Sequence, residues 1–521
     1  MDQFPWLSVL IALPVLGAFG VALLPKGSDE LAKRFALAVS VVVAVLTVVM
    51  ATQFSNNGDR FQFTETYWWI KQFGVHWGLG VDGVALVLIL LSVILVPLVI
   101  LASWSDAERS GGAAEVAPKR SVKTYFALLL TLEAMMIGVF AATDVFLFYV
   151  FFEAMLIPVY FIIGSYGGPQ RSYAAVKFLL YSLFGGLLML VAVIWLYVLS
   201  ARTGHATFMF GDLVKLNIDP TTAKWLFLGF FIAFAIKAPM VPFHTWLPDA
   251  AGQAPAGAAV LIVGVLDKVG TYGMLRFCLE LFPGAAKWAT PVVITLAVIG
   301  IVYGAVLAIG QVDLKRLIAY TSISHFGFII LGIFAMTSQG QSGATLYMVN
   351  HGFSTAALFL IAGFMISRRG SARIDAYGGV QKVAPLLAGT FLIAGLSGLS
   401  LPGLSSFVSE FLVLVGTFTR YKVPAVIATV GMILAAVYIL WMYQRTMNGP
   451  TAPEVGKMKD LSRRELVAVA PIIAIIVALG FFPKPVLDVI NPSVTHTLER
   501  VQMQDPKPSV GNKLAEKGVR P

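Results

Sequence analysis

Long apolar stretches constrain this sequence more than any other feature. Fourteen segments each hold about 20 mostly apolar residues, the length at which a helix rising about 1.5 Å per residue crosses a hydrocarbon core. Ten-residue alternating segments, which would indicate a membrane barrel, are not seen. The sequence therefore predicts an all-α membrane protein whose helices span approximately 4–25, 33–54, 81–103, 122–142, 145–165, 173–200, 224–248, 255–281, 290–311, 316–337, 343–366, 383–418, 423–447 and 465–482.

Composition excludes most other classes of protein. Of 521 residues, 58% are apolar and 12% charged, whereas soluble proteins are about 45–50% apolar and about 25% charged. A soluble domain, a disordered chain and a fibrous repeat are therefore excluded, and lipid must cover the outer surface. The net charge of +10 would suggest nucleic acid in a soluble protein, but most bases lie between apolar segments, where membrane orientation explains them.

A single cysteine, Cys278, limits the chemistry of the chain. One thiol cannot build a disulfide framework, a cysteine-rich zinc site or an iron–sulfur cluster. We expect no redox cofactor and no metal site in this chain. The first residues, Met1-Asp2-Gln3-Phe4, lack the basic start of a cleaved signal, so the first apolar segment is read as the first span.

Basic residues between the spans predict the orientation of the chain. Connections after odd-numbered spans hold 19 Lys and Arg residues, and those after even-numbered spans hold 8. By the positive-inside rule the former face the cytoplasm, which places both termini on the outer side. The tail after Pro483 carries six more bases, and we expect an amphipathic or disordered extension that contacts a partner.

Two spans contain helix-breaking sequences. Lys237-Ala238-Pro239 interrupts 224–248, and Leu401-Pro402-Gly403 interrupts 383–418. These are the seventh and twelfth spans, five apart, as expected of two inverted five-helix repeats in a transporter. We divide the chain into three N-terminal spans (1–103), a first repeat (122–282), a second repeat (290–447) and a last span with its tail (465–521). Accidental proline kinks are the alternative.

Six titratable residues lie near the middle of predicted spans. A charge at a helix centre costs about 2.5–3.5 kcal/mol, so such residues need a reason to be there. A proton relay is one explanation, with a Lys and Glu pair as its switch; pairs that hold helices together are the other. Lys177 and Arg276 lie about a turn from span ends and are expected to reach the headgroups. The six central residues are Glu153, Lys237, Lys268, His325, His351 and Glu410.

Three further residues are weaker candidates. Glu133 lies within 122–142 and has either a role in the proton route or an interhelical hydrogen bond. Asp267 either gives Lys268 a counter-charge or pairs with a different helix, since adjacent helical residues point about 100° apart. His244 follows the first break and is a candidate for support of the site.

Two motifs resemble a known family. Residues 235–255, including Lys237-Ala238-Pro239-Met240-Val241-Pro242-Phe243-His244-Thr245-Trp246-Leu247-Pro248-Asp249-Ala250, look like the signature of the antiporter-like subunits of proton-pumping NADH:quinone oxidoreductase, respiratory complex I. Asp313-Leu314-Lys315-Arg316-Leu317-Ile318-Ala319-Tyr320-Thr321-Ser322-Ile323-Ser324-His325 is similar to the next motif of that family. Within it, the residues around Glu153, Asn350-His351-Gly352 and Ser409-Glu410-Phe411 look most like the subunit M, or chain 4, branch.

The resemblance implies roles for the central residues. Glu153 and Lys237 resemble the proton-transfer pair of the family, Lys268 and His325 its central relay, and Glu410 its terminal acid; His351 also matches the pattern of the family. Relatives usually have a His where Ala251 stands, and most carry Leu at Asp267, so the cytoplasmic inlet departs from the pattern. Flavin, iron–sulfur clusters and quinone are expected in partner subunits, among them neighbouring antiporter-like subunits, in a bacterial inner membrane.

Two other functions stay open. A multisubunit cation/proton antiporter shares the broken-helix signature, and a non-conducting scaffold would only transmit movement or hold lipid. Gly78-x-Gly80-x-x-Gly83 fits a dinucleotide fingerprint as a string, but no strand is expected before it and a span follows, so we do not expect NADH to bind there.

Overall fold

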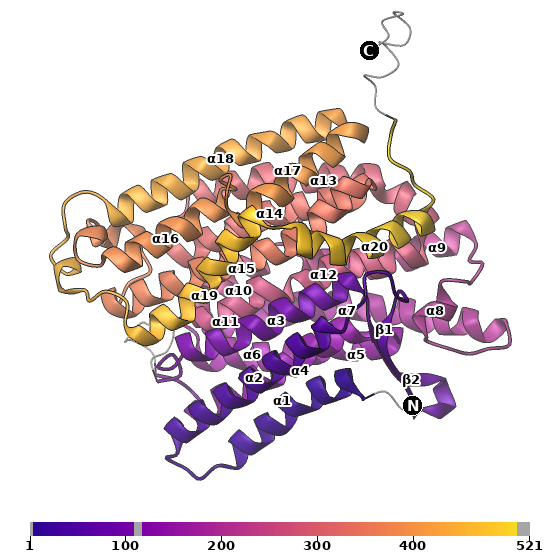
Figure 1. The fold of residues 1–521 in the computed structure, drawn as a ribbon, viewed down its shortest axis with the longest axis horizontal. Coiled ribbons are helices and arrows are strands. Elements are labelled where there is room, and N and C mark those ends of the chain that lie inside the picture. Colours follow the sequence, from indigo (N-terminus) through magenta and orange to yellow (C-terminus); the bar gives the residue numbers. More distant parts are fainter. Residues whose placement is uncertain (1–3, 109–116, 508–521) are drawn as a thin grey trace, which may run out of the picture.

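The chain folds into a bundle of long helices (Figure 1). The structure is a computed structural model, and it describes residues 4–108 and 117–507. Within these residues, twelve helices are long and apolar enough to cross a membrane. They are α1 (Trp6–Leu23), α2 (Asp29–Thr52), α3 (Gly83–Ala102), α4 (Val122–Ala141), α5 with α6 (Val145–Tyr166), α7 (Arg171–Arg202), the α11 to η4 run (Ala256–Leu279), α13 (Pro283–Ile309), α14 (Leu314–Ala335), α15 (Ser338–Arg369), α18 (Lys422–Met447) and α19 (Arg463–Phe481).

The other two of the fourteen expected spans are the interrupted ones. The first consists of α9 (Pro220–Lys237) and the short α10 (Trp246–Gln253), and the second of α16 (Pro385–Gly398) and α17 (Ser405–Arg420). Both breaks fall at the predicted proline sequences, so the all-α fold with two broken helices is confirmed. The spacing of the breaks is consistent with two inverted repeats.

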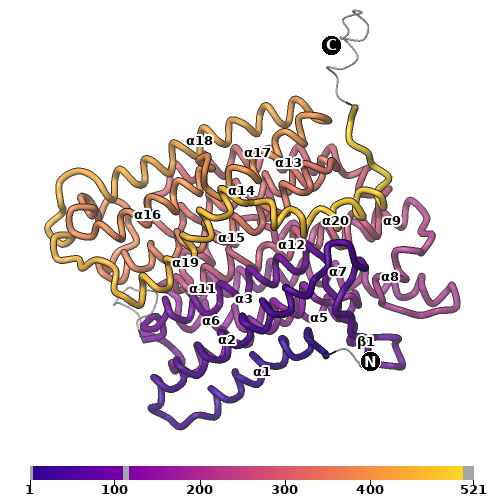
Figure 2. The backbone as a smooth tube through the Cα atoms, viewed as in Figure 1, coloured from indigo at the N-terminus to yellow at the C-terminus, as the bar shows by residue number. Residues whose placement is uncertain are grey.

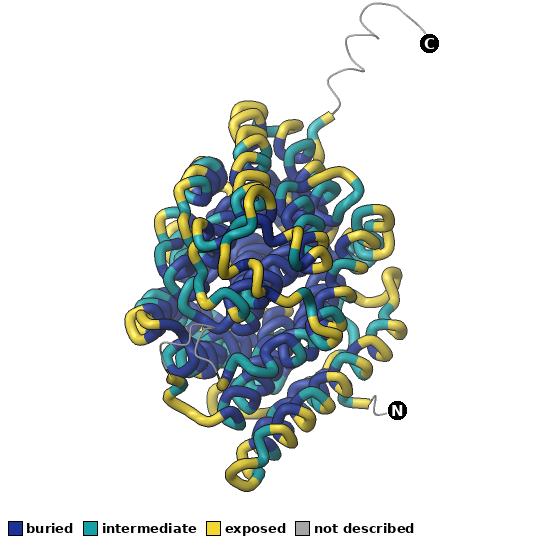
Figure 3. The backbone as a smooth tube through the Cα atoms, turned by 90° about the vertical axis from the view of Figure 1, so that its left-hand side faces the viewer, coloured by how far each residue is buried: buried dark blue, intermediate teal, exposed yellow. Residues whose placement is uncertain are grey.

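The centre of the bundle is formed by α14, α15 and the run from α11 (Ala256–Leu261) through η3 (Ile262–Leu266) and α12 (Lys268–Gly273) to η4 (Met274–Leu279). Nearly all residues of these helices are buried, whereas α2, α7 and α18 expose large apolar side chains such as Val45, Leu187 and Ile433. Figure 3 shows the buried backbone inside and the exposed backbone at the rim. An apolar rim of this kind suits contact with lipid.

A two-stranded antiparallel hairpin precedes α3. Strands β1 (Gln62–Ile70) and β2 (Val75–Val81) pair outside the spans, and Asp82 caps α3 by accepting from the N–H of Ala85. The expectation that no strand precedes the glycine string at 78–83 is therefore wrong. In the described residues, β2 pairs antiparallel with β1, and its Leu79 forms one isolated antiparallel bridge with Ala142, so β2 lacks the parallel neighbour that a dinucleotide fold would require. A Cβ atom at Gly83 would lie 1.8 Å from the carbonyl oxygen of Val489, so close packing explains this glycine.

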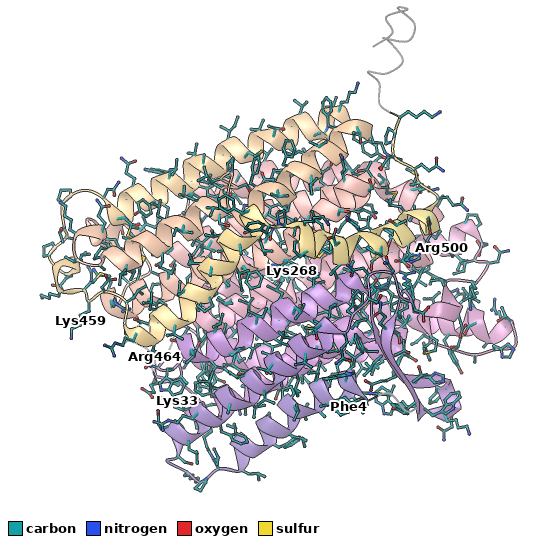
Figure 4. The ribbon with its side chains drawn as sticks, viewed as in Figure 1. Phe4, Lys33, Lys268, Lys459, Arg464 and Arg500 are labelled. Carbon is teal, nitrogen blue, oxygen red and sulfur yellow. The ribbon has the colours of Figure 1, made fainter. Side chains whose placement is uncertain are left out.

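The chain after Pro483 forms α20 (Lys484–Val501), an amphipathic helix that packs on α3 and α15. It lies across the flank of the bundle, drawn in yellow in Figure 2. This confirms the amphipathic expectation for residues 484–501; residues 508–521 lie outside the described residues. In Figure 4, Phe4 and Arg500 lie toward one end of the bundle, and Lys33, Lys459 and Arg464 lie at the other. The first and last described parts of the chain are therefore at the same end of the bundle.

Candidate functional site

Lys268 forms a hydrogen-bonded group at the centre of the molecule. Its ammonium Nζ lies 2.7 Å from Nδ1 of His351, and the other ring nitrogen of His351 lies 3.1 Å from the hydroxyl of Ser322. All three side chains are fully or almost fully buried, and Figure 4 shows Lys268 in the interior of the bundle. Three helices, α12, α15 and α14, thus bring a cation, an imidazole and a hydroxyl together.

A wide helical turn supplies a further acceptor to Lys268. Residues Ile262–Leu266 form a π-helix, and the carbonyl of Val263 accepts a hydrogen bond from Nζ. Local π-helical turns occur frequently at functional sites. Asp267, by contrast, is fully buried, and neither of its carboxyl oxygens has a hydrogen-bond partner among the described residues. It lies within electrostatic range of both Lys268 and Lys237, so the counter-charge to Lys268 acts at a distance and not through a direct ion pair.

His325 and Tyr347 extend this group toward the second break. The rings of His325 and His351 lie 5.3 Å apart, and those of His325 and Tyr347 lie 5.8 Å apart. The Tyr347 hydroxyl donates to Glu410 at 2.8 Å, and the Ser400 hydroxyl also bonds to Glu410. Since Ser400 lies in the break between α16 and α17, the interrupted helix places a donor beside the buried carboxyl group.

Lys237 is the last residue of α9, where the helix breaks. It is fully buried, its Nζ has no hydrogen-bond partner among the described residues, and Nζ lies 4.5 Å from the centre of the Phe152 ring. A helix C-terminus carries partial negative charge and favours a cation such as this one. Lys237 is also within electrostatic range of Glu153 and Asp267, although it forms no direct ion pair with either.

Glu153 packs tightly against α7. A Cβ atom at Gly186 would lie 1.7 Å from Oε1 of Glu153, so the carboxyl group occupies the space that the glycine leaves. That oxygen is buried without a hydrogen-bond partner among the described residues. Lys237 and Glu153 are therefore two ionisable groups within electrostatic range of each other and without a direct ion pair, an arrangement that allows their charge states to change.

The remaining candidates lie apart from this line. Glu133 is fully buried, and within residues 4–108 and 117–507 neither of its carboxyl oxygens has a hydrogen-bond partner, so the alternative of an interhelical hydrogen bond is not observed there. The ring of His244 packs edge-on against Tyr303 at 5.3 Å. The structure brings neither residue into the hydrogen-bonded groups around Lys268 and Glu410.

Two basic side chains near span ends have partners that the sequence analysis did not identify. The ammonium of Lys177 lies 2.7 Å from Asp249, and both side chains are partly exposed, so contact of Lys177 with the headgroups stays a prediction. Arg276 is buried and forms an ion pair with Asp82 at the start of α3. Both side chains are held by carboxylates from distant segments, which a reading of single spans does not reveal.

Sequence reasoning also missed the uncharged members of the site. Ser322, Ser400, Tyr347 and Tyr438 all contact the central residues, with the Tyr438 hydroxyl 3.5 Å from Nε2 of His325. The one available signal was spacing, because residues four apart share a helix face and Tyr347 is four residues before His351. In the part of the chain that the structure describes, no three His, Cys, Asp or Glu side chains gather as metal ligands.

Comparisons with known proteins identify the family of this chain. A family model described as "NADH:quinone oxidoreductase/Mrp antiporter, TM" matches residues 142–436. NADH-quinone oxidoreductase subunit M of Mycobacterium tuberculosis is 52% identical over 547 aligned positions, which cover 100% of this chain and 98% of the relative.

Solved structures show the same fold. A chain of respiratory complex I from Thermus thermophilus with bound NADH superposes with a TM-score of 0.86 at 31% identity, covering 95% of this chain and 99% of that one. A chain of the Mrp complex from Dietzia sp. DQ12-45-1b gives a TM-score of 0.81 at 20% identity, covering 96% and 100%. The second likeness concerns the fold alone.

Proposed function

The chain belongs to the family of membrane subunits of NADH:quinone oxidoreductases and Mrp antiporters, and from this premise we propose that it carries protons through the membrane arm of an NADH:quinone oxidoreductase. The observation that supports this most is the buried group that joins Lys268, His351 and His325 to Glu410 through Tyr347. Ionisable groups are costly at this depth. These ionisable groups contact one another in a continuous series. Separate pairs that only hold helices together would not need such a series, so the arrangement favours a proton relay.

Lys237 and Glu153 would act as the switch of the first half of the route. An ionised Glu153 attracts and stabilises the protonated Lys237 across a medium of low dielectric. If the carboxylate moves away or is neutralised, burial without a hydrogen bond favours release of the proton from Lys237. The missing direct ion pair suits this role, because a tightly bonded pair would hold both charges in place.

The second half of the route would run from Lys268 to Glu410. A neutral imidazole has one donor and one acceptor nitrogen, so His351 can accept a proton from Lys268 while its other nitrogen faces Ser322. His325 and Tyr347 then lie between His351 and Glu410. Glu410, bonded by Tyr347 and Ser400, would be the last acceptor before release, and Glu133, Asp267 and His244 are lesser candidates.

The wider assignment follows from the family. We propose that residues 122–282 and 290–447 form the two halves of the route. Neighbouring antiporter-like subunits would contact the chain in a bacterial inner membrane, with both termini outside. Flavin, iron–sulfur clusters and quinone would belong to other subunits, where NADH is oxidised and quinone reduced. The chain would then be a subunit of an enzyme whose redox groups are bound by other subunits.

Proton pumping by the assembled complex tests this assignment. We expect Lys237→Ala or Glu153→Ala to abolish NADH-driven acidification of inverted membrane vesicles, with the complex still assembled. Tight coupling would lower NADH:quinone activity as well. Near-normal pumping in both assembled variants would contradict the roles of these residues.

The two alternative functions predict different results. A cation/proton antiporter would show sodium-driven proton flux in vesicles without NADH, and the 20% identical Mrp chain shares only the fold. A scaffold would keep the number of protons per NADH when the central residues are neutralised. Flavin and iron–sulfur subunits that co-purify in mild detergent would favour the oxidoreductase.

A further inference from the structure

A cavity opens at the end of the bundle that carries Lys459 and Arg464 in Figure 4. It has a volume of about 370 Å³, which is room for about ten water molecules. The end of α3, the start of α11, the end of α15 and the segment before α19 enclose it, and its lining includes Asp106, Gly257, Arg368, Lys459 and Arg464. The basic residues of the odd-numbered connections lie at this end, which the orientation analysis places on the cytoplasmic side.

Asp106 is a carboxylate in the wall of this cavity that forms no direct ion pair with any described residue. Glu465, the other acid in the lining, is already held by Arg368 at 2.6 Å. Asp106 lies beside Ser103 and the backbone N–H of Gly257, within electrostatic range of Lys315 and Arg464. Burial raises its pKa above the ordinary value in spite of these neighbours, so this carboxyl group takes up a proton at a higher pH than an exposed aspartate does.

Polar groups with unused hydrogen-bonding capacity surround Asp106 on its inner side. The hydroxyls of Ser103 and Tyr125 are buried and make no hydrogen bond of ordinary geometry with the part of the chain that the structure describes. A Cβ atom at Gly257 would lie 1.9 Å from the Ser103 hydroxyl, so the lack of a side chain there lets this hydroxyl approach the start of α11. Such hydroxyls can relay protons through intervening water.

Lys315 continues this line into the protein along α14. Its side chain is buried, and its ammonium donates to the carbonyl of Ala254 at 2.9 Å. Ser322 lies seven residues further on the same helix, hence on the same face and about 10 Å along the axis. Ser322 in turn bonds to His351, which contacts Lys268.

We propose that protons reach Lys268 from this cavity by way of Asp106, Lys315 and Ser322. The proposal rests on the proposed function, since it supplies an inlet for the same route. About three hydrogen-bonded waters would bridge Lys315 and Ser322. This inlet does not need an ionisable side chain at position 251, where this chain has Ala.

The test compares carboxylates two residues apart in the assembled complex. Asp106→Asn removes the proton acceptor and keeps its size, and we expect NADH-driven pumping in proteoliposomes to fall at least about tenfold, as for loss of a positioned acid–base group. Asp106→Glu should restore most of the pumping, which a purely structural role would not predict. Glu108→Gln is the matched control, because Glu108 is exposed and pairs with Lys33 at 2.7 Å outside the cavity lining.

The outcome separates this inlet from the proposed function. If Lys237→Ala abolishes pumping and Asp106→Asn leaves it normal, the inlet is wrong and the proton role stands. If Lys237→Ala also pumps normally, the proposed function itself fails. Should Asp106→Asn not assemble, Ser367→Cys decides, since Ser367 lines the cavity: a charged thiol reagent should block pumping in that variant and spare the parent complex, and equal pumping in both would overturn the inlet.

Discussion

Gly186 offers a test of the Lys237 and Glu153 pair that removes no ionisable group. A Cβ atom at this position would lie 1.7 Å from Oε1 of Glu153, whereas ordinary contacts are about 3.5 Å. The carboxyl oxygen must therefore move by almost 2 Å in Gly186→Ala. Because a 1 Å misplacement of reacting groups can cost about 100-fold in rate, we expect proton pumping to fall at least about tenfold.

Gly164→Ala is the matched control for this substitution. Gly164 lies on α6 and faces α7, and a Cβ atom there would lie 3.4 Å from Cβ of Ala175, an ordinary contact. Both substitutions gain about 1 kcal/mol of helix propensity, so only the position of Glu153 distinguishes them. The measurement is NADH-driven proton pumping by assembled complexes that carry one or the other variant.

A double variant checks the cause of the loss. Glu153→Asp shortens the side chain by one methylene and relieves most of the clash. Gly186→Ala should then cost little further pumping in the Glu153→Asp background, which is a non-additive effect expected only of groups in contact. Equal pumping by Gly186→Ala and Gly164→Ala would refute the reasoning that the position of Glu153 governs the switch.

Three further predictions concern the supports of the site. Burial opposes the ionisation of Asp82, but Arg276 holds the pKa of this carboxyl group below the usual value. The ion pair therefore stabilises the fold fully above about pH 4, the pKa of an unfolded aspartate. This stabilisation is lost as the pH falls through the lower pKa of the folded state. The gap in unfolding temperature between the parent and Asp82→Asn should accordingly shrink in acid, and a constant gap would contradict this. Gly83→Ala places a Cβ atom 1.8 Å from a carbonyl oxygen of α20, and we expect a lower unfolding temperature by scanning calorimetry, with an unchanged value arguing against tight docking of α20. Tyr347→Phe removes the donor to Glu410, so pumping should slow with assembly intact, and normal rates would exclude Tyr347 from the route.

The spans, their breaks and the central charged residues could be predicted because each depends on local sequence. Apolar length identifies a spanning helix, and the prolines at 239 and 402 mark the ends of α9 and α16. Lys237 and Lys268 stand out because a charge within an apolar stretch is rare and costly. The same reasoning fixes their depth but gives no information on which helices face each other.

The missing parts of the site depend on tertiary packing. Tyr347 and Ser400 are uncharged and cost little within an apolar segment, so nothing in the sequence separates them from ordinary helix residues. Arg276 forms an ion pair with Asp82, which lies far away along the chain. Because a single span does not reveal this partner, the sequence analysis expected Arg276 to reach the headgroups. The hairpin before α3 was not predicted, because the exclusion of strands holds only within lipid and the hairpin lies outside the spans.

The number of protons moved per NADH oxidised tests the central claim most directly. It is measured in proteoliposomes that contain the assembled complex, with the parent chain and with Lys237→Met, which keeps the length of the side chain and removes its charge. A chain that conducts protons through its buried residues predicts a lower ratio, or arrested turnover if coupling is tight. An unchanged ratio at normal turnover would contradict proton conduction through this chain.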